Sequence, residues 1–127
     1  MQHLLEVRDL QKYYPVTHGA FKRVVGRVHA VDGVNFHVDS GETLGIVGES
    51  GCGKTSLGKC LVRLNVPTAG QMLLRGAGGE VQDLMRLGRR ESFETKRRIQ
   101  MVFQDPYASL NPVKSIWTAF DEPLRIH

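Results

Sequence analysis

A glycine-rich loop between an apolar run and a helical pattern constrains the fold of this chain more than any other feature. Residues 44–56 read Leu-Gly-Ile-Val-Gly-Glu-Ser-Gly-Cys-Gly-Lys-Thr-Ser. They match the G-x-x-x-x-G-K-[ST] pattern of loops that bind nucleotide phosphates. The apolar residues predict a strand at 43–47, and leucines spaced at helical intervals predict a helix from Lys54 onward. The strand, loop and helix together indicate one phosphate site in an α/β fold.

The residues of this loop have separate physical roles. Its glycines let the backbone adopt conformations that side chains exclude, so that N–H groups converge on phosphate oxygens. Lys54 supplies a charge for the β- and γ-phosphates, and the Thr55 hydroxyl is the better candidate Mg²⁺ ligand. A chance glycine-rich turn is the alternative interpretation. The pattern predicts that the nucleotide contacts Gly48, Glu49, Ser50, Gly51, Cys52, Gly53, Lys54, Thr55 and Ser56.

The composition of the chain is that of a globular protein. The chain has 127 residues, 41% hydrophobic and 24% charged, which suits one modest globular domain. Its apolar runs are short, so we expect neither a membrane span nor an export signal. The net charge of +4 gathers between residues 86 and 98. Phe93 is the only aromatic residue there, which favours a solvated helix face over a nucleic-acid surface.

The rest of the chain alternates strands, turns and weak helices. Alternating apolar residues indicate a strand at 29–38, and the basic stretch 17–27 before it resembles an exposed loop or a hairpin tip. Pro67 and Gly70 should end the helix that follows the glycine-rich loop. The remaining expected elements are strands at 3–14, 71–75 and 99–103, a helix at 83–97 and a short helical piece that reaches Glu122 and Pro123.

Four separated segments resemble an ATP-binding-cassette (ABC) ATPase in order and spacing. They are Glu6–Leu10 with Tyr13–Pro15, Ala30–Val34, Gly48–Ser56 and Val102–Pro106. Within that family, Gly48–Lys54, Gln104–Pro112 and Glu122–Leu124 are similar to the subunits that energise oligopeptide and dipeptide importers. The resemblance implies a P-loop NTPase core with an antiparallel β element formed by the N-terminal strands.

The family also implies a function and partners. Such subunits use ATP and Mg²⁺ to drive peptide uptake across the cytoplasmic membrane. They lie in the cytoplasm, peripheral on the inner face of that membrane, and work with a second ABC ATPase subunit and transmembrane permease subunits. They have no membrane span of their own and do not bind nucleic acid. Residues 1–127 would be the N-terminal part of such a nucleotide-binding domain.

The resemblance assigns further residues to the site. Tyr14 aligns with the aromatic residue that stacks on adenine, with Tyr13 as the second choice, although either could simply cover the core. Gln104 resembles the Q-loop glutamine, which holds the Mg²⁺ shell or the attacking water, so Lys54 and Gln104 are the expected catalytic residues. For Tyr107 and Phe120, contact with a partner and ordinary packing are equally open.

Several parts of the family pattern do not occur in this sequence. Residues 105–127 contain no Leu-Ser-Gly-Gly-Gln signature, no acidic strand end and no switch histidine, and the helical subdomain is largely absent. We therefore expect an incomplete core in which the strand at 43–47 has an unpaired apolar edge. We also expect that this chain alone does not hydrolyse ATP. The alternative function is a non-catalytic nucleotide-binding or interaction fragment from a truncated or split gene.

Overall fold

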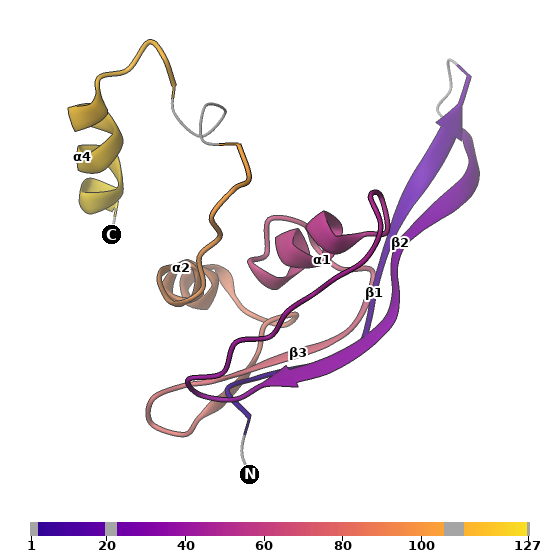
Figure 1. Cartoon of the computed structure of the whole chain (residues 1–127), viewed down its shortest axis with the longest axis horizontal. Helices are drawn as coiled ribbons and strands as arrows, with labels where there is room; N and C mark the ends of the chain where they lie inside the picture. The colour runs from indigo at the N-terminus through magenta and orange to yellow at the C-terminus, as the bar shows by residue number, and fades with distance from the viewer. Residues whose placement is uncertain (1–2, 20–22, 106–110, 127) are drawn as a thin grey trace.

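The computed structural model describes residues 3–19, 23–105 and 111–126, and within these ranges an antiparallel sheet of four strands dominates the fold. The strands are arranged in the order β2-β1-β3-β4. Their bounds are Leu5–His18 for β1, Arg23–Val38 for β2, Ala69–Arg75 for β3 and Val81–Asp83 for β4. The helices described are α1 at Lys54–Leu61, α2 at Arg89–Arg98 and α4 at Ile116–Ile126. Figure 1 shows α1 lying across the sheet and α4 standing apart from it.

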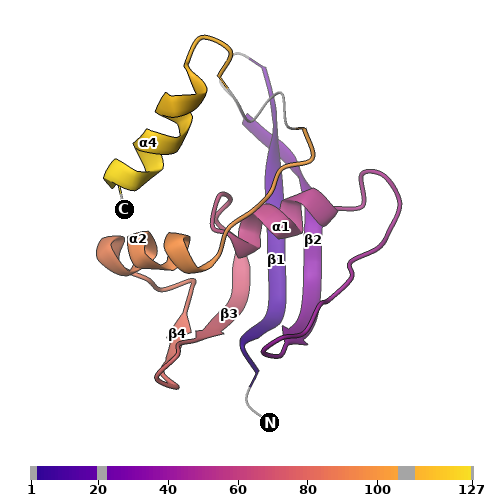
Figure 2. The ribbon, with the colours of Figure 1, turned by 60° about the vertical axis from the view of Figure 1, so that its left-hand side comes forward.

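The β1–β2 hairpin is longer than the sequence indicates. Pairing runs from Leu5 opposite Val38 to His18 opposite Arg23, so residues 17–18 and 23–27 are strand near the tip of a hairpin, as one of the two expectations had it, rather than loop. The β-branched residues Val24 and Val25 favour extended backbone, which explains why the strand continues there. Figure 2 shows the two strands continuing well past α1.

A small core joins α1 to the sheet. Leu57 and Cys60 are the buried residues of α1, and they meet strand residues that include Leu10 and Met72, both fully buried. Each large apolar side chain buried in this way contributes about 1.5–3 kcal/mol. The complete buried apolar set of the described residues is Val7, Leu10, Val31, Leu57, Cys60, Met72, Leu74 and Leu84. This core fixes α1, and with it the end of the glycine-rich loop, against β1 and β2.

Strand β3 approaches β1 at an irregular point. The β1–β3 register shifts between Arg8 and Gln11, and Asp9 has a left-handed φ of 46°. The Asn35 side chain accepts the Asp9 N–H at 2.8 Å, which anchors this irregular backbone to β2. Gly70 packs directly against it with a φ of +105°. Two strands can come this close here because residue 70 carries no side chain.

The expected strands at 43–47 and 99–103 are not formed. Both segments lie outside the sheet, and Val47 and Val102 are 93% and 96% exposed. A strand exists only when its N–H and C=O groups bond to a neighbour, and no neighbouring strand pairs with either segment in the described part of the chain. Segments 43–47 and 99–103 therefore have apolar, strand-like sequences but lack the hydrogen bonds to a neighbouring strand that define a sheet.

Helix and short-strand boundaries also differ from the sequence prediction. α1 ends at Leu61, before the expected stop at Pro67, because Arg63 turns to a φ of 58° and the Leu64 N–H bonds back to Lys59. α2 begins only at Arg89, because residues 81–83 pair with β3 as the unexpected strand β4. The prediction of β3 was correct apart from its first two residues.

The last helix keeps an apolar face in solvent. α4 runs three residues beyond Pro123 and has no buried residue. Phe120 is 69% exposed, so it does not pack into the core, and Tyr107 lies outside the described residues. The described helices include none that is both long and apolar enough to cross a membrane.

Candidate functional site

The glycine-rich loop ends in a backbone conformation that only glycine adopts readily. Gly51 and Gly53 have φ values of +81° and +98°, and Gly53 is the N-cap of α1. A Cβ on Gly53 would overlap the carbonyl oxygen of Ala30 in β2. No side chain caps the N-terminus of α1 among the described residues. The start of the helix is therefore open to an anionic ligand, and the helix dipole favours one there.

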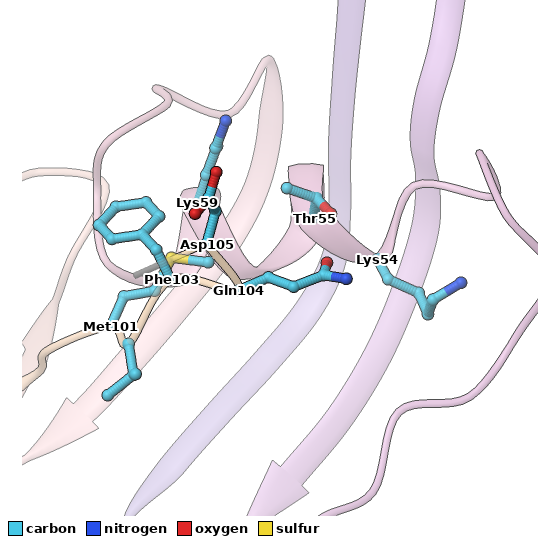
Figure 3. A pocket seen from close by; sticks show the side chains of 8 residues that line it. Lys54, Thr55, Lys59, Met101, Phe103, Gln104 and Asp105 are labelled. Carbon is cyan, nitrogen blue, oxygen red and sulfur yellow. The ribbon is translucent and has the colours of Figure 1, made fainter. Parts of the chain in front are cut away.

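The Lys54 side chain folds back over this loop. Its Nζ donates to the carbonyl oxygens of Gly48 and Glu49, at 2.6 Å each, and lies 3.5 Å from the Cys52 Sγ. Figure 3 shows it pointing away from Phe103 on the other side of the site. The ammonium group is thus held at the loop, where phosphate oxygens could replace the two carbonyls as its acceptors.

A cleft of about 780 Å³ opens beside the start of α1 and brings together residues that are far apart in the chain. Thr55 lines it from the helix and Gln104 from the segment that follows α2. In Figure 3 the Gln104 side chain extends toward Thr55 and Lys54. The cleft is lined by Lys54, Thr55, Lys59, Met101, Val102, Phe103, Gln104 and Asp105. A hydroxyl and an amide oxygen that line the same cleft are suitable ligands for a hard cation.

A second hollow, of about 390 Å³, lies on the β2 side of the same loop. It is lined by residues that include His29, Asp32 and Gly53. Tyr13 stacks on His29 with ring centroids 4.0 Å apart and donates a 2.5 Å hydrogen bond to Asp32. Neither His29 nor Asp32 was among the site residues predicted from the sequence. The cross-strand pairing of Tyr13 with His29 is the signal that locates them, and it requires the register.

The two tyrosines have different neighbours. The Tyr14 hydroxyl accepts a 2.8 Å hydrogen bond from Asn65, beyond the end of α1, and the Lys12 ammonium lies 4.9 Å from its ring centroid. Tyr13, in contrast, contacts residues that line the hollow beside the loop. Tyr13, the second choice for adenine stacking, is thus joined to two residues of this hollow, while Tyr14 is joined to the segment that follows α1.

The Tyr13–Asp32 contact makes a titration prediction. The hydrogen bond from Tyr13, assisted by one from His29, lowers the pKa of Asp32 below its ordinary value, and the same bond raises the pKa of Tyr13. A carboxyl group whose pKa is lower in the folded state stabilises the fold at pH values above its unfolded-state pKa. This contribution is lost as the pH falls through the folded-state pKa. In Tyr13→Phe we expect the Asp32 pKa to rise toward its ordinary value, measured by carboxyl ¹³C NMR.

The matched control is Tyr14→Phe. It removes the same hydroxyl group one residue further along, from a ring bonded to Asn65 rather than to Asp32. We expect it to leave the Asp32 pKa unchanged. An equal shift in both variants would show that the Tyr13 hydrogen bond is not the cause.

Comparison with known sequences gives a consistent result. A family model described as ABC transporter matches residues 31–123. The chain is 50% identical over 125 residues to the "Oligopeptide transport ATP-binding protein AppF" of Bacillus subtilis (strain 168), covering 98% of this chain and 36% of that protein. It is 43% identical over 128 residues to the "Dipeptide transport ATP-binding protein DppF" of Escherichia coli (strain K12), covering 99% and 36%. The chain thus spans roughly a third of the length of these relatives.

Solved structures agree at the level of the fold. The dimeric structure of MJ0796, described as a bacterial ABC transporter cassette, superposes with a TM-score of 0.69 at 21% identity, over 95% of this chain and 47% of that one. A post-hydrolysis state of the same cassette bound to ADP and Pi gives a TM-score of 0.56 at 22% identity, over 73% and 35%. These values show that the chain has part of the ABC ATPase fold.

Proposed function

This chain belongs to the ABC transporter family, and we propose that it binds ATP through residues 48–56 as part of a subunit that energises peptide import. One observation carries the proposal: the Lys54 ammonium is held over a loop whose closing residue, Gly53, has no room for a side chain. The names of the relatives, oligopeptide and dipeptide transport ATP-binding proteins, support peptides as the transported class.

The proposed contacts are of two kinds, those to the nucleotide phosphates and those to Mg²⁺. The phosphates are held by the backbone of Gly48, Glu49, Ser50, Gly51, Cys52 and Gly53, by the Lys54 ammonium and by residues Thr55 and Ser56. Thr55 and Gln104, which line the same cleft, hold Mg²⁺. When bound, Mg²⁺ neutralises charge on the β- and γ-phosphates. Lys54 and Gln104 are accordingly the residues nearest to the transferred phosphoryl group.

The base lies toward the N-terminal strands in this proposal. Tyr14 stacks on adenine, as the family alignment implies, and Tyr13 is the alternative that the hollow beside β2 supports. Titrations of Tyr13→Ala and Tyr14→Ala with ATP distinguish the two tyrosines. Only the variant that lacks the stacking ring should bind ATP more weakly. Tyr14→Phe is the control for the hydrogen bond between Asn65 and the Tyr14 hydroxyl, because it removes this bond and keeps the ring.

The proposed partners are transmembrane permease subunits and a second ATPase subunit at the inner face of the cell membrane. The exposed apolar side of α4 supports contact with such a partner, since Trp117, Phe120 and Leu124 are 78%, 69% and 80% exposed. Hydrolysis by this chain alone is not proposed, because residues 105–127 lack the signature, the acidic strand end and the switch histidine. Coupling of hydrolysis to transport would then need those residues and the second subunit.

Calorimetric titration with Mg-ATP tests the proposal. We expect binding to the 127-residue chain and a loss of affinity of about tenfold or more in Lys54→Ala, since one charge-assisted contact to the phosphates is removed. Lys59→Ala is the matched control, because Lys59 lines the same cleft from the following turn of α1 and does not reach the loop. Equal losses in both variants, or unchanged affinity in Lys54→Ala, would contradict the proposed site.

A further inference from the structure

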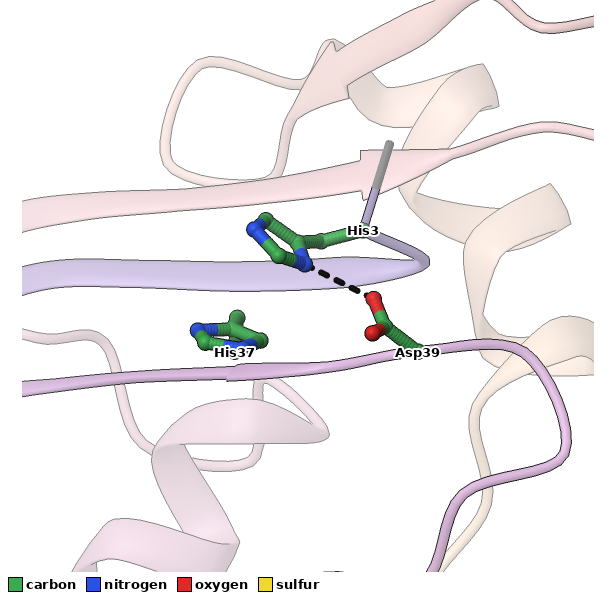
Figure 4. A group of neighbouring side chains, drawn as sticks. All are labelled: His3, His37 and Asp39. Carbon is green, nitrogen blue, oxygen red and sulfur yellow. Dashed lines mark hydrogen bonds and ion pairs between the residues drawn. The ribbon is translucent and has the colours of Figure 1, made fainter. Parts of the chain in front are cut away.

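A second group of ligand-type side chains lies at the end of the sheet where the chain begins. His3, His37 and Asp39 each offer a nitrogen or oxygen atom, and these atoms all lie within 4.8 Å of one another. Figure 4 shows the His3 ring above that of His37, with Asp39 beside them. None of these residues lines the two hollows at the glycine-rich loop.

The backbone holds these three residues in position. His37 belongs to β2, and Asp39 comes two residues after it, directly beyond the end of that strand, on the same side of the extended chain. The Leu4 N–H bonds to the Val38 carbonyl at 2.9 Å, which brings His3 back across the hairpin. The His3 carbonyl also accepts a 3.2 Å bond from Arg75. The ligand atoms are thus presented by anchored backbone at the start of β1 and at the end of β2.

The turn after β2 fixes the third residue in the same way. The Asp39 N–H donates to the Glu42 carboxylate at 2.6 Å, and the Asp39 carbonyl accepts the Glu42 N–H at 3.2 Å. The carboxylate of Asp39 takes no part in these two bonds and contacts His3 Nδ1 at 2.7 Å. The His3 and His37 ring centroids are 3.8 Å apart, tilted by 30°. Two imidazole rings and a carboxylate this close can each turn one ligand atom toward a single cation at the edge of the rings.

We propose that His3, His37 and Asp39 form a site for a divalent transition metal, with Zn²⁺ as the best-suited ion and a fourth position open to water. Two imidazoles and a carboxylate are common zinc ligands, whereas Mg²⁺ prefers oxygen ligands alone. The site is therefore chemically distinct from the proposed Mg²⁺ position at Thr55 and Gln104. Bound metal would join the start of β1 to the end of β2.

The three side chains must rearrange to accept the ion, because their ligand atoms lie within 4.8 Å of one another but are not yet at zinc-ligand spacing. Donor atoms at about 2.0–2.1 Å from a tetrahedral Zn²⁺ lie about 3.3 Å apart, so the 2.7 Å contact between His3 and Asp39 must open by roughly half an ångström. Their side chains are 31% and 41% exposed, which leaves room for that movement. Glu6, paired with His37 across the strands, adds negative charge nearby, although Arg8 offsets it through a 2.7 Å ion pair.

Calorimetric titration with zinc chloride tests this proposal directly. The chain should carry no histidine tag, and Cys52→Ser serves as the reference protein because the exposed Cys52 thiol is a competing zinc ligand. We expect one Zn²⁺ per chain in the reference protein and affinities weaker by about tenfold or more when His3→Asn or His37→Asn is added. Zinc should also raise the Tm of the reference protein and leave that of the His37→Asn variant nearly unchanged.

His29→Asn is the matched control. His29 also contacts an aspartate on this hairpin, at 3.2 Å from Asp32, and it lies outside the metal-ligand group. We expect it to keep the zinc affinity of the reference protein, and circular dichroism checks that each variant is folded. The proposal is overturned if no stoichiometric zinc binding occurs, if folded His3→Asn and His37→Asn bind as the reference does, or if His29→Asn loses as much affinity.

Discussion

Replacing Gly70 with alanine is expected to lower the free energy of unfolding by about 3 kcal/mol or more. Residue 70 has a φ of +105°, and an added Cβ would lie 2.5 Å from the Asp9 carbonyl oxygen and 2.7 Å from the Leu10 Cα. Both atoms belong to backbone, so neither can rotate away. Strand β1 would have to shift, and it carries Leu10, a fully buried core residue. Urea unfolding followed by circular dichroism measures the effect.

Gly79→Ala separates strain from overlap. Gly79 has a similar φ of +86°, yet a Cβ added there would meet no described atom within 4 Å. Its alanine variant should therefore lose only the conformational part, about 1–2 kcal/mol. If the two variants lose equal stability, the close approach of β3 to β1 at Gly70 does not constrain the fold. A domain of this size has a free energy of unfolding of about 5–15 kcal/mol, so a loss of about 3 kcal/mol would clearly lower the urea concentration at the unfolding midpoint.

Gly53→Ala is expected to weaken Mg-ATP binding by about a hundredfold, or about 2.7 kcal/mol. Its φ is +98°, and the new Cβ would overlap the Ala30 carbonyl oxygen in β2. The loop must then move away from the sheet, and the start of α1, which Gly53 caps, moves with it. The Lys54 ammonium would lose its position over the loop. Calorimetry with Mg-ATP gives the affinity, and thermal melting shows the accompanying loss of stability.

Gly51→Ala is the control within the same loop. Its φ is +81°, and its Cβ would meet no described atom within 4 Å. We expect strain of about 1–2 kcal/mol without displacement of α1, and therefore a smaller loss of affinity than in Gly53→Ala. Equal or reversed losses would mean that contact with β2 does not set the shape of the phosphate loop.

The parts of the fold that depend on neighbouring residues could be predicted from the sequence. The start of α1 at Lys54 follows from the glycine-rich loop and the helical spacing after it, and the structure confirms it. The strand at 29–38 was identified by apolar alternation, and the strands predicted at 3–14 and 71–75 also form, with errors at the ends of all three. These signals are local, because glycine conformation and side-chain periodicity do not depend on what the chain meets elsewhere.

The parts that depend on pairing could not be predicted. Segments 43–47 and 99–103 have strand-like sequences, yet a strand also needs a hydrogen-bonded neighbour, which local pattern does not reveal. The short strand β4 was missed for the converse reason, since pairing with β3 makes it a strand. Contacts between side chains on paired strands could not be predicted either, because they depend on the register of the pairing. Tyr13 meets His29, and His3 meets His37, only once the alignment of β1 with β2 is known.

The long strand β2 lies at one border of the sheet, and no strand of the described chain lies beyond it. Its outer row of peptide groups is a template onto which a second molecule could add a strand of its own. Val24, Val25 and Val28 are all more than half exposed near its start, which adds apolar surface to that template. Arg23 and Arg27 are the opposing features, because positive charges on such a border repel a like copy. Solubility at high concentration should therefore depend on keeping these two arginines.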